Sequence, residues 1–136
     1  MKLVVAYLVF ALIFAIIDVI WIGFIAFNFY KQQLGDLMAD NFNMVAATAF
    51  YLLYVLGALI FVVSPSLQMP SGGVVNALIY GGLFGFFCYM TYDLTNLAVV
   101  KNFPTTMALV DIAWGTTVTA VCSAATVAVM GLIYPK

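Results

Sequence analysis

Long apolar runs dominate the pattern of this chain, and short polar segments separate them. The runs predict four membrane-spanning helices, at about residues 3–29, 44–63, 74–99 and 105–133. About 20 apolar residues in a helix cross a hydrocarbon core of roughly 30 Å. The pattern therefore predicts an all-α fold, an integral membrane four-helix bundle in which residues 1–136 form a single transmembrane domain.

The polar segments between the runs indicate how the spans are connected. Residues 30–43 form the only long connection, either a short interfacial helix or a solvated loop. Pro65 is predicted to end the second span, because a segment rich in Ser, Pro and Gly follows it. The connection around Pro104 is short, which makes the third and fourth spans antiparallel neighbours. Gly81 and Gly85 predict close contact between these two spans.

Three aspartates interrupt the apolar runs at membrane depth. Asp18 lies in the first span, Asp93 in the third and Asp111 in the fourth. An aspartate at a helix centre costs about 2.5–3.5 kcal/mol on insertion scales, so such residues are functional candidates. All four lysines lie in loops or near the termini, which leaves the carboxylates without a fixed counter-ion. Either protons are retained, so that the acids tie helices together, or a cation binds.

The rise of an α-helix places the polar residues of all four spans in one half of the membrane. Asp93 and Asp111 lie about 9 Å from the side that carries the first and third loops, and Asp18 about 16 Å from it. We therefore predict a pocket that is closed at one end and opens toward that side. The candidate ligand-binding residues are Asp18, Trp21, Tyr51, Tyr89, Tyr92, Asp93, Asn96, Asp111 and Trp114.

A short motif occurs in both the first and the fourth span. Residues 15–21 and 108–114 both read Ala-φ-φ-Asp-φ-φ-Trp, where φ is an apolar residue. These two spans run in opposite directions, so the motif is consistent with a weak inverted repeat between helices 1 and 4, as in many transporters. Chance or shared packing requirements are the alternative explanation.

Composition narrows the classes of function. The chain is 67% apolar and 7% charged, with a net charge of -1. These values exclude an ordinary soluble domain and favour the lipid bilayer, not nucleic acid, as a partner. The chain has no histidine, which excludes histidine acid–base chemistry and His-ligated metal sites. Cys88 and Cys122 fall inside apolar runs and are expected to be free thiols.

The third span contains Tyr92-Asp-Leu-Thr-Asn-Leu-Ala98, and the fourth contains Val110-Asp-Ile-Ala-Trp-Gly115. With Asp18 and Trp21, these segments resemble the signatures of an uncharacterised bacterial family of small four-span inner-membrane proteins, a domain of unknown function. The resemblance covers essentially the whole chain. It implies a helical fold in a bacterial inner membrane, but no reaction. The motif positions carried over as candidate site residues are Asp18, Trp21, Tyr92, Asp93, Asn96, Asp111 and Trp114.

Membrane orientation rests on a weak charge signal. Lys2 and Lys136 lie on one side of the predicted bundle, and Lys31 and Lys101 on the other, so the lysine count is equal. The free amino terminus favours both termini inside, N-in and C-in, under the positive-inside rule. The mouth of the predicted pocket would then face outward.

Three functions compete. The first is binding or transport of a proton, a cation or a small polar or amine-bearing solute, with aromatic side chains around the cation. Four spans are few for a carrier, so transport favours a homodimer. The second is a membrane enzyme acting on a lipid or isoprenoid, with Asp and Tyr as acid and base or with three aspartates holding Mg²⁺.

The third function is that of an accessory or structural membrane subunit, whose polar residues join it to a partner. A polar stripe facing the lipid would favour this function, whereas an inward-facing cluster would favour the first two. We rank binding or transport first, with a solute, a cation or a lipid headgroup as the ligand, and expect no cofactor. The sequence leaves open whether the protein is an enzyme.

Overall fold

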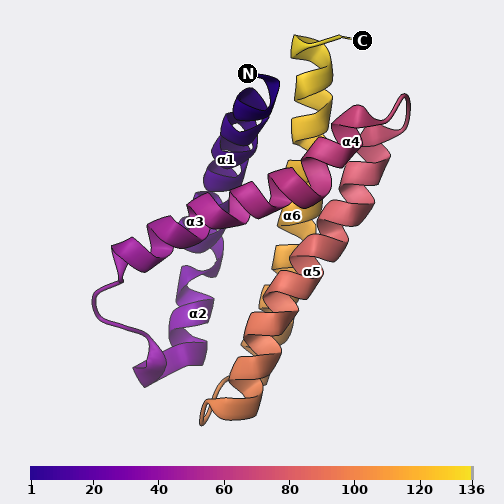
Figure 1. Cartoon of the computed structure of the whole chain (residues 1–136). Coiled ribbons are helices and arrows are strands. Elements are labelled where there is room, and N and C mark those ends of the chain that lie inside the picture. The colour runs from indigo at the N-terminus through magenta and orange to yellow at the C-terminus, as the bar shows by residue number, and fades with distance from the viewer. Residues whose placement is uncertain (136) are drawn as a thin grey trace.

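Helices are the only regular secondary structure in the part of the chain that the computed structural model describes, residues 1–135 (Figure 1). Four continuous helical rods are long and apolar enough to cross a membrane: Lys2–Leu37, Met44–Gln68, Gly73–Val99 and Thr105–Ile133. The predicted all-α membrane bundle is therefore confirmed. The first and last helices bring both ends of the chain to the same end of the bundle (Figure 1).

The first rod changes its helix type in the middle. Helix α1 (Lys2–Ile20) passes into the π-helix η1 (Trp21–Ala26), which continues as α2 (Phe27–Leu34) and ends in the 3₁₀ turn η2 (Gly35–Leu37). The π-helix has a wider turn than the α-helix and is frequent at functional sites. The rod extends eight residues beyond the predicted end at residue 29, so much of the expected first loop is helical.

The second rod also contains a π-helix, and the prediction that Pro65 ends it is wrong. Helix α3 (Met44–Ala58) continues through η3 (Leu59–Val63) into α4 (Ser64–Gln68). Proline lacks a backbone N–H and is tolerated only where no helical hydrogen bond is required from it. Pro65 lies in the first turn of α4, directly after the wide turn of η3, and the chain remains helical for three more residues.

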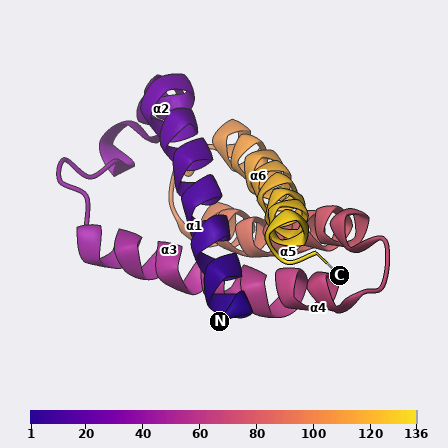
Figure 2. The ribbon, with the colours of Figure 1, turned by 90° about the horizontal axis from the view of Figure 1, so that it is seen from above.

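Helices α5 (Gly73–Val99) and α6 (Thr105–Ile133) pack against each other over most of their length (Figures 1 and 2). Glycines make this approach possible. A Cβ atom on Gly85 would lie 2.2 Å from the Gly115 carbonyl oxygen, and one on Gly81 would lie 2.6 Å from Ser123 Oγ. The predicted close contact between the third and fourth spans is confirmed.

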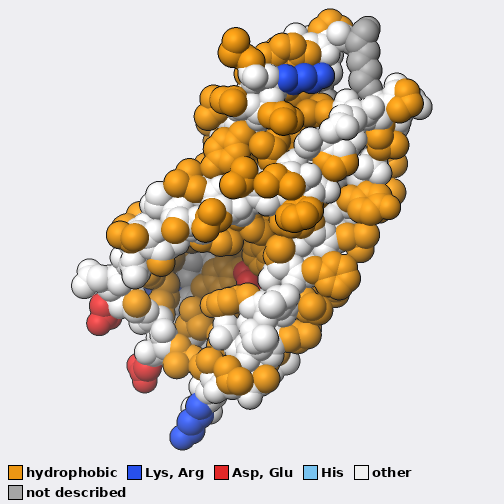
Figure 3. All heavy atoms as spheres, in the orientation of Figure 1, with side chains coloured by type: hydrophobic (Ala, Val, Ile, Leu, Met, Phe, Trp, Pro, Cys, Tyr) orange, Lys and Arg blue, Asp and Glu red, His pale blue; other side chains and the backbone are white. Residues whose placement is uncertain are grey.

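The packed core lies toward the end of the bundle that carries both termini. There, Phe10 and Phe14 of α1 are fully buried with Val63 of η3 and Met130 of α6. Large apolar side chains also cover the outside of the bundle, whereas charged side chains gather near its two ends (Figure 3). This distribution fits a molecule whose outer surface contacts lipid.

Candidate binding site

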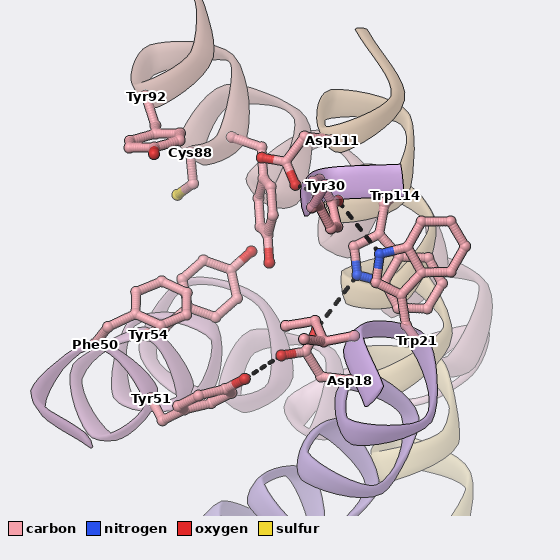
Figure 4. A pocket seen from close by; sticks show the side chains of 12 residues that line it. Asp18, Trp21, Tyr30, Phe50, Tyr51, Tyr54, Cys88, Tyr92, Asp111 and Trp114 are labelled. Atoms are coloured by element: carbon pink, nitrogen blue, oxygen red, sulfur yellow. Dashed lines mark hydrogen bonds between the residues drawn. The ribbon is translucent and has the colours of Figure 1, made fainter. Parts of the chain in front are cut away.

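A cavity of about 470 Å³ lies in the half of the bundle away from the termini, and all four rods contribute to its wall (Figure 4). Its volume is in the range of small-molecule pockets, about 300–1,000 Å³. Most of the side chains in the wall are aromatic, and two are carboxylates. The lining residues are Asp18, Trp21, Ile22, Tyr30, Phe50, Tyr51, Tyr54, Cys88, Tyr89, Tyr92, Asp111 and Trp114.

Asp18 lies near the end of α1 and joins that helix to two others. Its Oδ2 accepts a hydrogen bond from the Tyr51 hydroxyl of α3, and its Oδ1 accepts one from Trp114 Nε1 of α6 at 3.3 Å. The side chain is 5% exposed. Both donors hold the carboxylate in a fixed orientation at the wall of the cavity (Figure 4).

Asp111 lies near the start of α6 and is held from the first rod. Its Oδ1 accepts a hydrogen bond from the Tyr30 hydroxyl of α2 at 2.9 Å, and that hydroxyl accepts one from Trp21 Nε1 at 3.3 Å. Within residues 1–135, Tyr30 is the residue whose hydroxyl donates to this carboxylate, and the buried Asp93 carboxyl lies beside it. Asp111 lines the cavity, so a ligand in the cavity can reach its carboxylate.

The two copies of the Ala-φ-φ-Asp-φ-φ-Trp motif meet in the structure. The rings of Trp21 and Trp114 stack with centroids 4.2 Å apart and planes at 8°. Trp114 binds Asp18 of the first copy, while Trp21 reaches Asp111 of the second copy through Tyr30. Because α1 and α6 run in opposite directions (Figure 1), the contacts have an approximate two-fold relation, the geometry that an inverted repeat would produce.

Two of the nine predicted site residues do not line the cavity. The side chain of Asp93, in α5, is completely buried. Asn96 follows it by one turn of the same helix and is half-buried. Neither Asp93 oxygen has a hydrogen-bond partner within the described chain. Asp93 interacts with Asp111, a lining residue of the cavity, so Asp93 lies behind the cavity wall. The other seven predicted residues line the cavity.

Tyr89 owes its position in the cavity to a glycine on the facing helix. A Cβ atom on Gly115 would lie 2.1 Å from the Tyr89 ring. The ring therefore occupies the space where any other residue at position 115 would have a side chain. Close packing of α5 and α6 thus also places a lining residue of the site.

Tyr30 is a site residue that sequence reasoning did not find, and the π-helix explains why. Tyr30 follows Asp18 by twelve residues, which in a uniform α-helix would place it about 120° away around the axis. The wider turn of η1 rotates the chain less per residue. The smaller rotation per residue offsets this 120° angle, and Tyr30 points toward Asp111 on the neighbouring helix.

The other lining residues missing from the prediction carry weaker signals. Tyr54 follows Tyr51 by one helical turn, and its hydroxyl is 2.7 Å from Thr119 Oγ1 of α6. Cys88 precedes Tyr92 by one turn, so the spacing could have indicated it. Phe50 and Ile22 are apolar residues in apolar spans and carry no sequence signal of a site.

The chemistry available in the cavity is that of two carboxylates within an aromatic wall. No lysine is among the lining residues. Within residues 1–135, no three Asp or Cys side chains are grouped closely enough to hold one metal ion. The arrangement hypothesised for Mg²⁺, with Asp18, Asp93 and Asp111 around one ion, is therefore not formed. Aromatic faces and carboxylates together attract organic cations.

Comparison with known proteins gives a match to a family of membrane proteins. The model of a family described as "Predicted membrane protein (DUF2177)" matches residues 3–128, nearly the whole chain. No curated protein and no solved structure matches the chain significantly.

Proposed function

The chain belongs to the DUF2177 family of membrane proteins, and we propose that its intramembrane cavity binds a cation, specifically an ammonium group on a small organic solute. The observation that carries this proposal is the pair of carboxylates, Asp18 and Asp111, in a cavity whose wall contains no basic side chain. A positively charged ligand would supply the missing counter-charge.

The aromatic wall supports an organic ammonium group over a bare metal ion. An ammonium group gains from contact with Trp and Tyr faces, especially where water is excluded. The stacked pair Trp21 and Trp114 and the ring of Tyr89 supply such faces next to the carboxylates. A hard metal ion would instead require several oxygen ligands around one point.

The aspartate side chains face the interior of the bundle, which supports a binding site over a role as an accessory subunit. Asp18 and Asp93 are buried, and Asp111 lines the cavity. A subunit that used aspartates to hold a partner helix would present them on its lipid-facing surface. The inward arrangement leaves the outer surface to apolar side chains and concentrates the polar groups around one internal space.

The experiment is a thermal unfolding titration of the purified protein in a neutral detergent. Tetramethylammonium chloride should raise the free energy of unfolding by RT ln(1 + [L]/Kd), about 2.7 kcal/mol at a hundred times Kd, and the melting temperature with it. Sodium chloride should not. Asp111→Asn and Asp18→Asn should abolish the shift. The matched control is Asp36→Asn in the 3₁₀ turn η2 outside the cavity, which should respond as wild type does. Identical responses in wild type and all variants would contradict the proposal.

A further inference from the structure

One side of the cavity opens between α3 and α5. The first half of α3 diverges from α5 (Figure 1), and the space-filling view shows a hollow at this place with an acidic side chain inside it (Figure 3). In the close view, Phe50 of α3 and Cys88 and Tyr92 of α5 lie on one side of the cavity, opposite the stacked tryptophans (Figure 4). The opening is thus bordered by aromatic and thiol groups, and the carboxylates lie further inside.

The exposure of the lining side chains decreases from the opening toward the inside of the cavity. Tyr92 is 58% exposed and Phe50 is 45% exposed at the opening, whereas Asp18 is 5% exposed inside. Phe50 lies six residues from the start of α3, and Tyr92 seven residues from the end of α5. At 1.5 Å per residue these positions are about 9–11 Å from the helix ends, measured along each helix axis. In a bilayer, an opening on the side of the bundle at this distance from the helix ends would face lipid chains.

We propose that the ligand is a membrane amphiphile that binds sideways, with its ammonium headgroup at Asp111 and Asp18 and its hydrocarbon chain passing between α3 and α5 into the bilayer. This inference rests on the proposed function and names its ligand class and route of access. An apolar chain matches the border of Phe50 and Cys88, and the depth of the opening matches the acyl region of a bilayer.

The charges inside the cavity select the headgroup. A phosphate or carboxylate in the ligand would approach two carboxylates with no lysine among the lining residues to pair with it. The expected headgroup therefore has a net positive charge near the tryptophans. Two sources offer an ammonium group in a membrane: a cationic amphiphile, or the ethanolamine headgroup of a phospholipid with its phosphate kept outside the cavity.

Tryptophan fluorescence tests the inference without a label, because both tryptophans of the chain line the cavity. The protein is reconstituted in vesicles of digalactosyldiacylglycerol, a bilayer lipid that has no ammonium group and cannot compete with the probes. It is titrated with dodecyltrimethylammonium brominated close to the headgroup, a modification that quenches indole emission on contact. A brominated dodecyl maltoside is the neutral control of the same chain length, and a brominated phosphatidylethanolamine represents the second source.

The expected result is saturable quenching by the cationic amphiphile, in excess of the neutral one and reversed by unbrominated dodecyltrimethylammonium. Asp111→Asn should weaken this binding about tenfold or more, since it removes the negative charge that attracts the ammonium group, while Asp36→Asn should not. If Asp111→Asn does not fold, the comparison of the amphiphiles on wild type still decides the inference. Excess quenching by phosphatidylethanolamine as well would support the inference with a bilayer lipid as the source.

Equal quenching by cationic and neutral amphiphiles would overturn the inference, because contact would then reflect lipid at the outer surface. Stabilisation by tetramethylammonium without selective quenching would overturn lateral access and leave the proposed function standing. If neither probe responds, both proposals are wrong.

Discussion

Two phenols hold the two carboxylates of the cavity. Tyr51 binds Asp18 from α3, and Tyr30 binds Asp111 from α2. Each donor stabilises a carboxylate in surroundings with little water, where an unmade hydrogen bond has a large penalty. The two tyrosines therefore determine both the position of the acids and part of the cost of burying them.

Tyr51→Phe should lower the free energy of unfolding by about 1–3 kcal/mol, because Asp18 loses one of its two donors in a largely buried position. The matched control is Tyr80→Phe, since Tyr80 is 55% exposed on the outer surface and forms no hydrogen bond within the described chain. Unfolding in mixed detergent micelles measures both variants. Equal losses for Tyr51→Phe and Tyr80→Phe would contradict the role given to the Asp18 contact.

Asp93 should be replaceable by asparagine without loss of stability. An ionised carboxylate with no donor in apolar surroundings costs several kcal/mol, so a form that can donate a hydrogen bond to Asp111 is favoured. An asparagine side chain at this position would keep a donor of similar size and cannot ionise. We expect Asp93→Asn to raise the melting temperature or leave it unchanged, and to remove a carboxylic-acid C=O band from the infrared spectrum. A clear loss of stability would mean that a negative charge at Asp93 has a partner in the folded protein.

At the scale of the elements, the contact of α5 and α6 depends on glycines that cannot accept a side chain. Gly85→Ala should destabilise the protein by about 1–3 kcal/mol, as overpacking does, because its Cβ would lie 2.2 Å from the Gly115 carbonyl oxygen. Gly131→Ala is the control in the same helix pair, since a Cβ there meets nothing within 4 Å. It should be neutral or stabilising, because alanine favours the helix. Thermal unfolding of the two variants compares them directly.

The sequence predicted the parts of the structure that depend on regular α-helix geometry. A constant rise per residue placed the residues Asp18, Asp111, Trp21, Trp114 and Tyr51 in the same half of the membrane, and these residues do line one cavity. The two π-helices are where the sequence prediction failed, because apolar periodicity gives no sign of a wider turn. One π-helix turned Tyr30 toward the site, and the other allowed the chain to remain helical through Pro65.

The faces of α5 could not be assigned from its sequence either. Polar residues occur on several sides of its second half, and spacing does not tell which side meets α6 and which meets the cavity. In the structure, Asp93 is buried and interacts with Asp111 of α6, whereas Cys88, Tyr89 and Tyr92 border the cavity. The candidate list therefore included Asp93 and Asn96, which lie outside it.

At the scale of the whole molecule, the two ends of the bundle differ in packing. The end with both termini has a filled core, and the other end has the cavity. This division lets the packed end stabilise the fold while the other end retains an unfilled space. Topology is the property of the whole chain that can be tested most simply.

Thiol labelling should place both termini on the same side of the membrane. In reconstituted vesicles of one orientation, Lys2→Cys and Pro135→Cys should react with a membrane-impermeant maleimide from one side, and Asn102→Cys in the loop between α5 and α6 from the other (Figure 1). The native thiols Cys88 and Cys122 lie within the spans, and the parent protein measures their background. Reaction of positions 2 and 135 from opposite sides would contradict the four-span topology.

The stacked indoles have an optical consequence. Two stacked chromophores 4.2 Å apart share their electronic excitation. Because the two indoles come from antiparallel helices, we expect their transition moments to be rotated relative to each other within the stacked planes and to give a paired positive and negative signal in circular dichroism. Such an exciton couplet needs both partners, and either Trp21→Phe or Trp114→Phe should abolish it completely, not halve it. Because one indole comes from η1 and the other from α6, the couplet reports whether the first and last spans are assembled. Its loss during unfolding, while the helical signal remains, would mark a state in which the helices are formed but separated.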